Sequence, residues 1–212
     1  LLRAALLRLD AREHVAVLTM HHIASDGWST GLLVREFTAL YEAFRTGAAN
    51  PLPPLALQYA DFAHWQRTSL QGEELESQLA YWRGQLAGLP RSHGLPLDRP
   101  RPAAPDLRGG AVERDIGRDT LAALHGLASE HEASLFMVLQ AALALTLGRW
   151  SGETDVVVGS PTAGRTHRAL EPLIGFFINS LVLRTELSGD PTFTELLGRV
   201  RHTVLDAFAH QA

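Results

Sequence analysis

A proline- and glycine-rich stretch near the middle of the chain, residues 88–110, limits the fold more than any other feature. It holds five prolines and has glycine at both ends, and proline neither continues a helix nor donates a hydrogen bond to a strand ladder. The segments on both sides show regular helix and strand patterns. This stretch is therefore the best candidate for a linker or a lobe boundary, in a chain whose length suits one large domain or two small lobes.

Composition excludes several classes of protein. The 212 residues are 46% hydrophobic and 20% charged, which is the range of globular chains and not of disordered ones. A net charge of −4 argues against bulk electrostatic binding to nucleic acid or to an anionic membrane. There is no cysteine, which excludes disulfides, thiolate metal sites and a cysteine nucleophile. This composition fits a reducing cytoplasm.

The ends of the chain and its apolar runs bear on targeting. The longest apolar run, residues 135–147, is shorter than the roughly 18 to 20 residues that span a membrane. The first ten residues carry charges and lack the cleavage pattern of a signal peptide. The sequence starts at Leu1 inside an apolar stretch and stops at an expected helix end. We expect it to be a piece of a longer polypeptide.

Periodicity predicts a mixed chain of helices and strands in both halves. In the first half we expect strands at 1–9 and 14–21, a helix at 30–45 capped by Ser29, and a helical region at 59–86 that breaks near Gly72. In the second half we expect strands at 110–116, 155–158 and 176–187, helices at 119–131 and 134–149, and a last helix opened by the capping box Thr192–Glu195.

The stretch His21-His22-x-x-x-Asp26-Gly27 is the most informative for chemistry. Adjacent strand residues point to opposite faces, so only one of the two histidines can face a given cleft. Gly27 permits a sharp turn after the strand, and a neutral imidazole can accept or pass a proton near pH 7. Taken alone, a histidine pair at a strand end is explained more simply by packing and solvent exposure.

Three other chemistries have weaker support. His22 and Asp26 could be two metal ligands, but no His-Glu-x-x-His or His-x-His pattern accompanies them. Residues 159–166 nearly match a phosphate-binding loop, yet Arg165 replaces its lysine and no helix is expected to follow. The triplet Gly159-Ser160-Pro161 has the wrong spacing for the Gly-x-Ser-x-Gly elbow of a serine hydrolase. Any acyl transfer is therefore expected to be direct, from a carried thioester to a second substrate.

Five segments together resemble a condensation domain of a non-ribosomal peptide synthetase. Residues 19–29, TMHHIASDGWS, resemble its HHxxxDG signature, and residues 59–65, YADFAHW, resemble the aromatic motif that follows. Residues 158–165, VGSPTAGR, resemble its characteristic loop, residues 174–184 its IGxFxN strand, and residues 209–211 the start of its HQD motif. They occur in the family's order and cover nearly the whole chain.

The resemblance implies an α/β fold, an α+β sandwich of two lobes that each resemble chloramphenicol acetyltransferase. Both lobes are incomplete in this sequence. By this resemblance, residues 1–95 correspond to the late part of the first lobe, which carries HHxxxDG, residues 96–110 to the linker between the lobes, and residues 111–212 to the early part of the second lobe. The family's active site lies in a tunnel between the lobes.

The resemblance also implies the reaction and its partners. A donor acyl or peptidyl thioester on the phosphopantetheine arm of an upstream carrier domain is attacked by the amine of an aminoacyl thioester on a downstream carrier. No cofactor or metal is expected to bind the domain directly. An adenylation domain is expected in the same polypeptide, whereas nucleic acid and membrane are not expected partners.

Roles for individual residues follow from the same resemblance. His22 is the catalytic histidine, which takes a proton from the amine or orients it. Asp26 pairs with an arginine to hold the turn, and Gly27 leaves room for the acyl chain. The supporting residues are His21, packed inward against the first-lobe sheet, Asn179, close to the tunnel, and Arg165 in the loop motif.

Departures from the family pattern refine these expectations. The family's N-terminal motifs are absent, including the stretch expected to supply the arginine partner of Asp26. Gly27 and the lack of a DxxxxD replacement argue against heterocyclisation, and residues 26–29, Asp-Gly-Trp-Ser, favour condensation over epimerisation. Residues 29–36 favour a donor that ends in an L-residue. A related acyltransferase with a free acceptor and a non-catalytic carrier-docking module stay open. The isolated chain is expected to be inactive and prone to aggregate.

Overall fold

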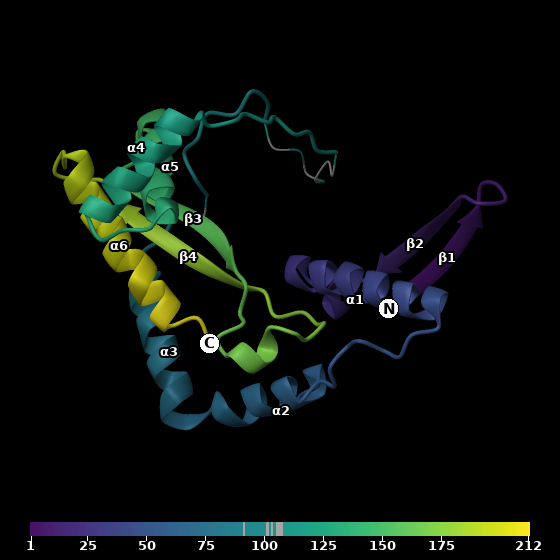
Figure 1. Cartoon of the computed structure of the whole chain (residues 1–212). Helices are drawn as coiled ribbons and strands as arrows, with labels where there is room; N and C mark the ends of the chain where they lie inside the picture. Colours follow the sequence, from purple (N-terminus) through teal and green to yellow (C-terminus); the bar gives the residue numbers. More distant parts are fainter. Residues whose placement is uncertain (91, 101, 103, 105–107) are drawn as a thin grey trace. The chain divides into compact units, whose positions relative to one another are not determined.

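The structure is a computed structural model that describes residues 1–90, 92–100, 102, 104 and 108–212. Helices and strands are mixed, as predicted (Figure 1). The expected linker, residues 96–110, falls partly on positions 101, 103 and 105–107, which lie outside the described residues. Its described positions form neither helix nor strand.

The chain folds as two compact units. The first comprises residues 1–78, 161–180 and 212, and the second comprises residues 79–160 and 181–211. The predicted division into two lobes and a linker stays a prediction. The elements in chain order are β1 Leu2–Arg8, β2 His14–Met20, the 3-10 turn η1 His22–Ala24, α1 Gly27–Thr46, α2 Tyr59–Ser69, α3 Gly72–Gln85, α4 Arg118–Glu130, α5 Leu135–Ser151, β3 Asp155–Thr162, the 3-10 turn η2 Arg168–Leu170, β4 Asn179–Glu186 and α6 Phe193–Ala209.

Three predicted strands differ from the structure, and one of them, expected at 155–158, continues as β3 to Thr162. Residues 110–116 form no strand, because no strand among the described residues pairs with them and an unpaired segment has no ladder for its backbone groups. The strand expected at 176–187 starts only at Asn179, because the residues just before it hydrogen-bond to the start of α1 instead. Both sheets of the described chain are two-stranded.

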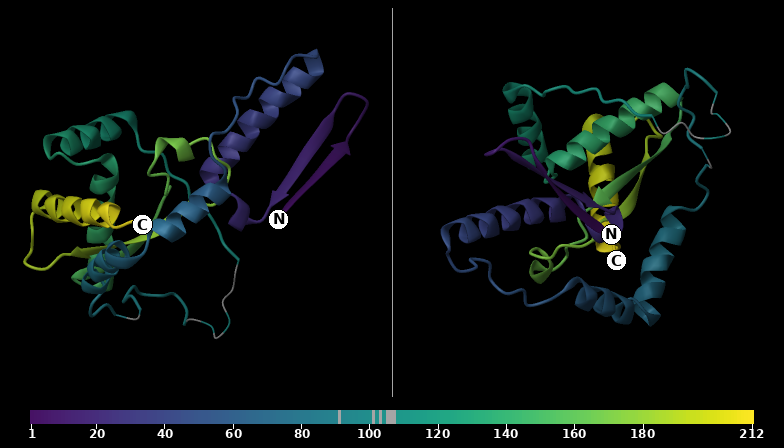
Figure 2. Two further views of the ribbon diagram at one scale, coloured as in Figure 1. Left: turned by 90° about the horizontal axis from the view of Figure 1, so that it is seen from below. Right: turned by 90° about the vertical axis from the view of Figure 1, so that its right-hand side faces the viewer.

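The first unit opens with an antiparallel hairpin in which Leu2 lies opposite Met20 and Arg8 opposite His14. The carboxylate of Asp10 closes the turn by accepting hydrogen bonds from the backbone N–H groups of Arg12 and Glu13, at 2.6 Å and 2.9 Å. Every residue of β1 is exposed. Figure 2 shows the hairpin as a ribbon that no helix of the same unit covers.

The apolar side chains of this hairpin predict self-association of the isolated chain. Leu6 is 70% exposed and Leu18 41% exposed, on strands whose outer edges are also unpaired. Light scattering after gel filtration should therefore detect oligomers or aggregates of the 212-residue chain. The double variant Leu6→Lys, Leu18→Lys should associate less. A monodisperse monomer with a cooperative thermal transition would contradict this expectation.

The core of the second unit joins one strand to three helices. Alternate residues of β4, Leu181 and Leu183, are buried, as expected for a strand with one inner face. They pack against side chains spaced three or four apart on α6, of which Val200 and Val204 are each 1% exposed. Helix α5 lies beside α6, and α4 beside α5 (Figure 1). Buried residues of α4 and α5 complete this cluster. Each such side chain contributes about 1.5 to 3 kcal/mol by leaving water.

Helix α5 is the most apolar helix of the chain, so its length bears on whether the chain could span a membrane. Among the described residues, no single helix is both long and apolar enough to cross a membrane. Helices α4 and α5 meet that criterion only as a pair, and the chain bends by 102° between them. The inner face of α5 is buried in the core of the second unit.

The end of α3 is held within the second unit by two side chains. Arg184 on β4 binds both carboxylate oxygens of Asp155, at 2.9 Å and 2.8 Å, and donates to the carbonyls of Gln85 and Ala87. Trp82 on α3 donates its indole N–H to the carbonyl of His210, 2.8 Å away. His210, the first residue of the expected HQD motif, therefore contacts α3 through its backbone, and its ring stacks on that of Tyr81 with the centroids 4.0 Å apart.

Candidate active site

The histidine pair lies just after β2 and not within it. The strand ends at Met20, and His22 begins the 3-10 turn η1, so strand alternation does not set the directions of the two rings. His21 is exposed, and its Nδ1 accepts a hydrogen bond from the backbone N–H of Ile23 at 3.1 Å. The expectation that His21 packs inward is therefore wrong for this structure: its ring caps the turn that carries His22.

His22 presents its imidazole to solvent. Its ring meets the ring of Phe176 edge to face, with centroids 5.5 Å apart and planes at 84°. Within the described part of the chain, neither ring nitrogen of His22 has a hydrogen-bond partner. Both nitrogens are thus available to a ligand.

Asp26 begins the helix that follows. Its Oδ1 accepts the backbone N–H of Ser29 at 2.7 Å, so Asp26 and not Ser29 is the N-cap, and α1 starts three residues before the predicted position. Its Oδ2 accepts the backbone N–H of Phe177 at 3.1 Å. This carboxylate therefore joins the start of α1 to the segment before β4.

Arg165 is the cation that faces Asp26. Its Nη2 lies 3.4 Å from Oδ1 of Asp26 and 2.9 Å from Oγ of Ser29, and the two charged side chains are only 2% and 1% exposed. Its Nη1 donates to the carbonyls of Leu170 and Leu173. The expectation that the arginine partner of Asp26 belongs to an absent N-terminal stretch is therefore wrong, because the loop motif supplies it.

Aromatic faces enclose this guanidinium. Its carbon lies 4.0 Å from the ring centroid of Phe177 and 5.7 Å from that of Trp28. Planar guanidinium stacks on such faces and forks between several acceptors, which the point charge of lysine cannot do. The arginine that weakened the phosphate-loop interpretation is thus the residue that this site requires.

Ser29 links Arg165 to the backbone of Gly175, a role that was not predicted from the sequence. It is fully buried, and its hydroxyl accepts from the backbone N–H of Gly175 at 3.0 Å and from Arg165 while donating to the carbonyl of Gly175 at 2.8 Å. One donor and two acceptor positions are then all used. The available signal was a small hydroxyl residue in the first turn after Asp-Gly, which we interpreted as a helix cap.

Two glycines of the motifs fill positions that no larger residue fits. Gly164 has φ of 62°, and a Cβ there would lie 1.8 Å from the carbonyl oxygen of Phe177. A Cβ on Gly175 would lie 2.2 Å from the ring of Tyr59. Close approach of backbone and ring therefore explains why glycine stands next to Arg165 and next to the aromatic pair at 176–177.

A buried apolar cluster packs next to Arg165 and its partners. Phe62, Leu170, Leu173 and Phe177 are buried together, and the ring of Tyr59 meets Phe177 edge to face at 5.2 Å. The YADFAHW segment on α2 supplies Tyr59 and Phe62. The aromatic motif thus packs against the IGFFIN segment.

The remaining candidate residues lie apart from this network. Gly27 is the first residue of α1, and apart from its chain neighbours and its own helix backbone no atom lies within 4 Å of where its Cβ would be. Its expected role of leaving room for the acyl chain stays a prediction. It has no positive φ, so the turn does not depend on a left-handed glycine. Asn179 is exposed at the start of β4, and its link to the tunnel stays a prediction. Among the described residues, no group of three acidic or histidine side chains could hold a metal ion.

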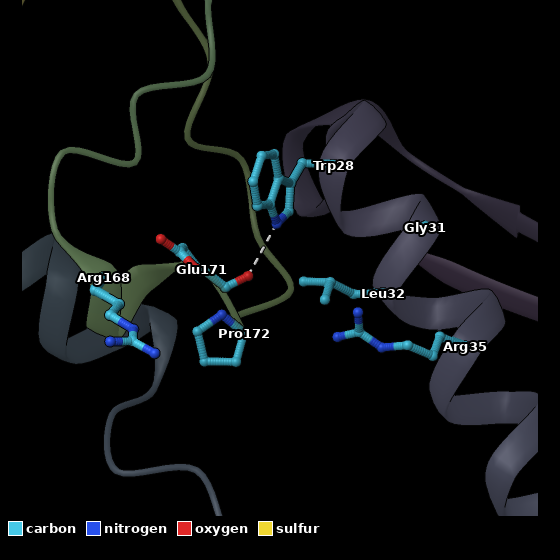
Figure 3. Close-up of a pocket in the computed structure, with 7 residues that line it drawn as sticks. All are labelled: Trp28, Gly31, Leu32, Arg35, Arg168, Glu171 and Pro172. Atoms are coloured by element: carbon cyan, nitrogen blue, oxygen red, sulfur yellow. Dashed lines mark hydrogen bonds between the residues drawn. The ribbon is translucent and has the colours of Figure 1, made fainter.

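A pocket of about 560 Å³ opens beside the site in the same unit. The indole of Trp28 forms one wall and is held by a 2.9 Å hydrogen bond to the carbonyl of Glu171 (Figure 3). Two exposed arginines, Arg35 and Arg168, reach it from α1 and η2. His22 does not line this pocket, so we do not assign it as the reaction site.

Comparison with known families gives a match along the whole length of the chain. A family model described as the condensation domain matches residues 1–212. The chain belongs to the condensation-domain family. A relative, the malpibaldin synthetase of Mortierella alpina, is 49% identical over 211 residues, which is 100% of this condensation-domain chain and 4% of that synthetase.

Solved structures agree with this family. The X-domain in complex with OxyB from teicoplanin biosynthesis is 38% identical, with a TM-score of 0.89 over 99% of this chain and 47% of that one. The first condensation domain of the calcium-dependent antibiotic synthetase, in complex with a substrate analogue, is 27% identical, with a TM-score of 0.70 over 99% and 48%. The α/β class is confirmed. This chain spans about half the length of these solved chains. The term complete domain denotes this chain extended at its ends to the length of those solved domains.

The ionisation of Asp26 makes the stability of the condensation domain depend on pH. Burial alone raises the pKa of Asp26, but hydrogen bonds from Ser29 and Phe177 and the charge of Arg165 outweigh it, so the pKa of this carboxyl lies below its ordinary value. The unfolded carboxyl has a pKa of about 3.9. This stabilisation is therefore fully present above about pH 4 and is lost as the pH falls through the lower folded pKa.

Urea unfolding of the complete domain across this range should show that loss. Asp26→Asn should be less stable at pH 7 and should lose less stability on acidification, because the amide does not titrate. Equal slopes of unfolding free energy against pH in the two proteins would contradict the assignment to Asp26.

Proposed function

We propose that the complete domain forms amide bonds between carrier-bound substrates. The amine of an aminoacyl thioester on a downstream carrier attacks the carbonyl carbon of an acyl or peptidyl thioester on an upstream carrier. A C–N bond forms, the C–S bond breaks, and the upstream phosphopantetheine leaves as a thiol that takes the proton lost by the amine. An adenylation domain in the same polypeptide is the proposed source of the loaded acceptor, and the cytoplasm is the proposed site of action.

The observation that carries this proposal is the exposed imidazole of His22 beside a rigid buried network. Its two ring nitrogens have no partner among the described residues, so one can accept the proton of the attacking amine. Asp26 cannot act as that base, because its lowered pKa and its bonds to Ser29, Phe177 and Arg165 keep it ionised and engaged. The network holds the turn, and His22 faces the substrates.

Energetics support this division of roles. A thioester is already activated, and two tethered substrates held in register gain about 7 to 11 kcal/mol from proximity. A positioned base then adds about 10² to 10⁴-fold. One histidine without a nucleophilic serine, a cysteine or a metal is therefore enough for the proposed transfer.

The test is intact-mass measurement of transfer between a loaded donor carrier and a loaded acceptor carrier, with and without the complete domain. The acceptor carrier should gain the mass of the donor acyl group, and the donor should return to its free thiol. A soluble amine in place of the acceptor carrier tests the free-acceptor alternative. Failure of the folded domain to transfer to several amine acceptors would contradict the proposed catalysis.

A carrier-docking module is the second candidate function. It is favoured by the similarity to an X-domain whose structure is that of a complex with OxyB. A docking module would bind loaded carriers and give no transfer, so a binding measurement beside the mass assay separates the two functions. His22→Ala would leave the output of a docking module unchanged.

Two finer features belong to the same proposal. The donor is proposed to end in an L-residue, on the resemblance of residues 29–36, and paired donors that differ only in that stereocentre test it. The 212 residues alone are proposed to be inactive. Transfer by the isolated chain at the rate of the complete domain would contradict this.

A further inference from the structure

We propose that Phe176 and Tyr59 position the imidazole of His22 for the transfer reaction. The ring of Phe176 supports the imidazole directly, and the hydroxyl of Tyr59 fixes the backbone that carries this ring. The inference deepens the proposed function and rests on it. It assigns a role to the variable position of the IGxFxN pattern and to the first residue of the YADFAHW segment.

The contact between the two rings is specific in geometry. Their centroids lie 5.5 Å apart and their planes meet at 84°, the edge-to-face arrangement that aromatic rings favour. Phe176 is 37% exposed, whereas the next residue, Phe177, is 5% exposed and lies in the core cluster. The core is therefore filled by Phe177, while the ring of Phe176 contacts His22.

The backbone around Phe176 has little freedom. Gly175 is bonded through both its N–H and its carbonyl to Ser29, and the N–H of Phe177 is bonded to Asp26. The carbonyl of Phe176 accepts the hydroxyl of Tyr59 at 2.8 Å. Three successive residues are thus tied, which fixes the direction of the Phe176 side chain.

Tyr59 is itself held in place. Its ring meets Phe177 edge to face at 5.2 Å, and it passes so close to Gly175 that a Cβ there would lie 2.2 Å from it. Its hydroxyl therefore has a fixed position from which to bind the Phe176 carbonyl. The line of contacts runs from α2 through Tyr59 and Phe176 to the imidazole of His22.

Loss of this support should lower kcat more than it raises KM. A misoriented imidazole still lets both carriers bind, but it accepts the proton less well. The energy typical of an aromatic pair corresponds to a fall in kcat of about 2- to 12-fold for Phe176→Leu. Tyr59→Phe, which keeps the ring and removes the hydroxyl, should also lower kcat, but by a smaller factor.

The experiment uses the complete domain and two readouts. One is kcat and KM for loaded carriers, and the other is the NMR signals of the ring protons of His22, which the Phe176 ring shifts by its ring current. Phe176→Leu should move these signals and lower kcat, while Phe176→Tyr should restore both. The matched controls are Phe44→Leu and Tyr41→Phe on α1, whose side chains are 80% and 60% exposed. Both controls should leave the signals and kcat unchanged.

The outcomes separate the positioning role from stability and from the proposed function. Thermal unfolding of each variant shows whether it is folded. Unmoved His22 signals in folded Phe176→Leu, or moved signals with wild-type kcat, would overturn the inference. If the wild-type domain transfers nothing, the proposed function fails, whereas unmoved NMR signals in Phe176→Leu and Tyr59→Phe would reject the contact itself.

Discussion

The His22→Ala variant of the complete domain should transfer acyl groups about 10² to 10⁴-fold more slowly than the wild type while it folds normally. The rate falls because the amine loses its proton acceptor. Folding is unaffected because the imidazole is exposed and its nitrogens bond to no other described residue. Residual transfer remains, since the thioesters are still held in proximity. Single-turnover intact-mass kinetics with loaded carriers measures the effect.

The matched control is His64→Ala, which removes another exposed imidazole from α2 in the same unit. It should keep the wild-type rate. Circular dichroism and thermal unfolding should be the same for both variants and for the wild type. Transfer by His22→Ala at the wild-type rate would remove His22 from the mechanism and leave the docking module as the better proposal.

The second large effect is on stability. Arg165→Met should lower the free energy of unfolding by about 3 to 5 kcal/mol, because it leaves the carboxylate of Asp26 buried without its cation. The hydroxyl of Ser29 and the carbonyls of Leu170 and Leu173 lose their donor as well. Methionine keeps most of the volume, so the change is electrostatic and not a cavity. Urea unfolding of the complete domain at pH 7 measures it.

Two further variants define the origin of that loss. The double variant Arg165→Met, Asp26→Asn should lower the free energy of unfolding by less than the sum of the two single changes, because the two side chains act as one pair. Arg35→Met removes an exposed guanidinium from α1 and should change stability by no more than about 0.5 kcal/mol. A loss below about 1 kcal/mol for Arg165→Met would mean that the pair contributes no more than a surface salt bridge.

Local patterns predicted most of the elements. The helices of both halves follow from apolar residues at helical spacing, and the capping residues Ser134 and Thr192 mark their helix starts correctly. The segment that carries His22 and Asp26 was also identified from sequence, since adjacent polar residues after a strand of β-formers are visible locally. The strand predicted at 110–116 failed because a strand depends on a partner that local pattern does not supply.

The network beneath the histidine could not be predicted in the same way. Asp26 and Arg165 are 139 residues apart, and Ser29 and Gly175 are 146 apart. Nothing in either segment specifies the other, although each was singled out by its own motif. The predicted direction of the His21 side chain was wrong for a local reason. The strand ends at Met20, one residue earlier than predicted, and the His21 ring accepts a hydrogen bond within the turn that follows.

This separation along the chain has a consequence for biosynthesis. At about 5 to 20 residues per second, the ribosome makes Arg165 roughly 7 to 28 seconds after Asp26. During that interval the aspartate has neither its cation nor the backbone N–H of Phe177, which is synthesised later still. The turn that carries His22 is therefore completed only after translation of the IGFFIN segment, residues 174–179, which contains Phe177. A nascent chain stalled before that point should hold His22 on an unanchored helix start.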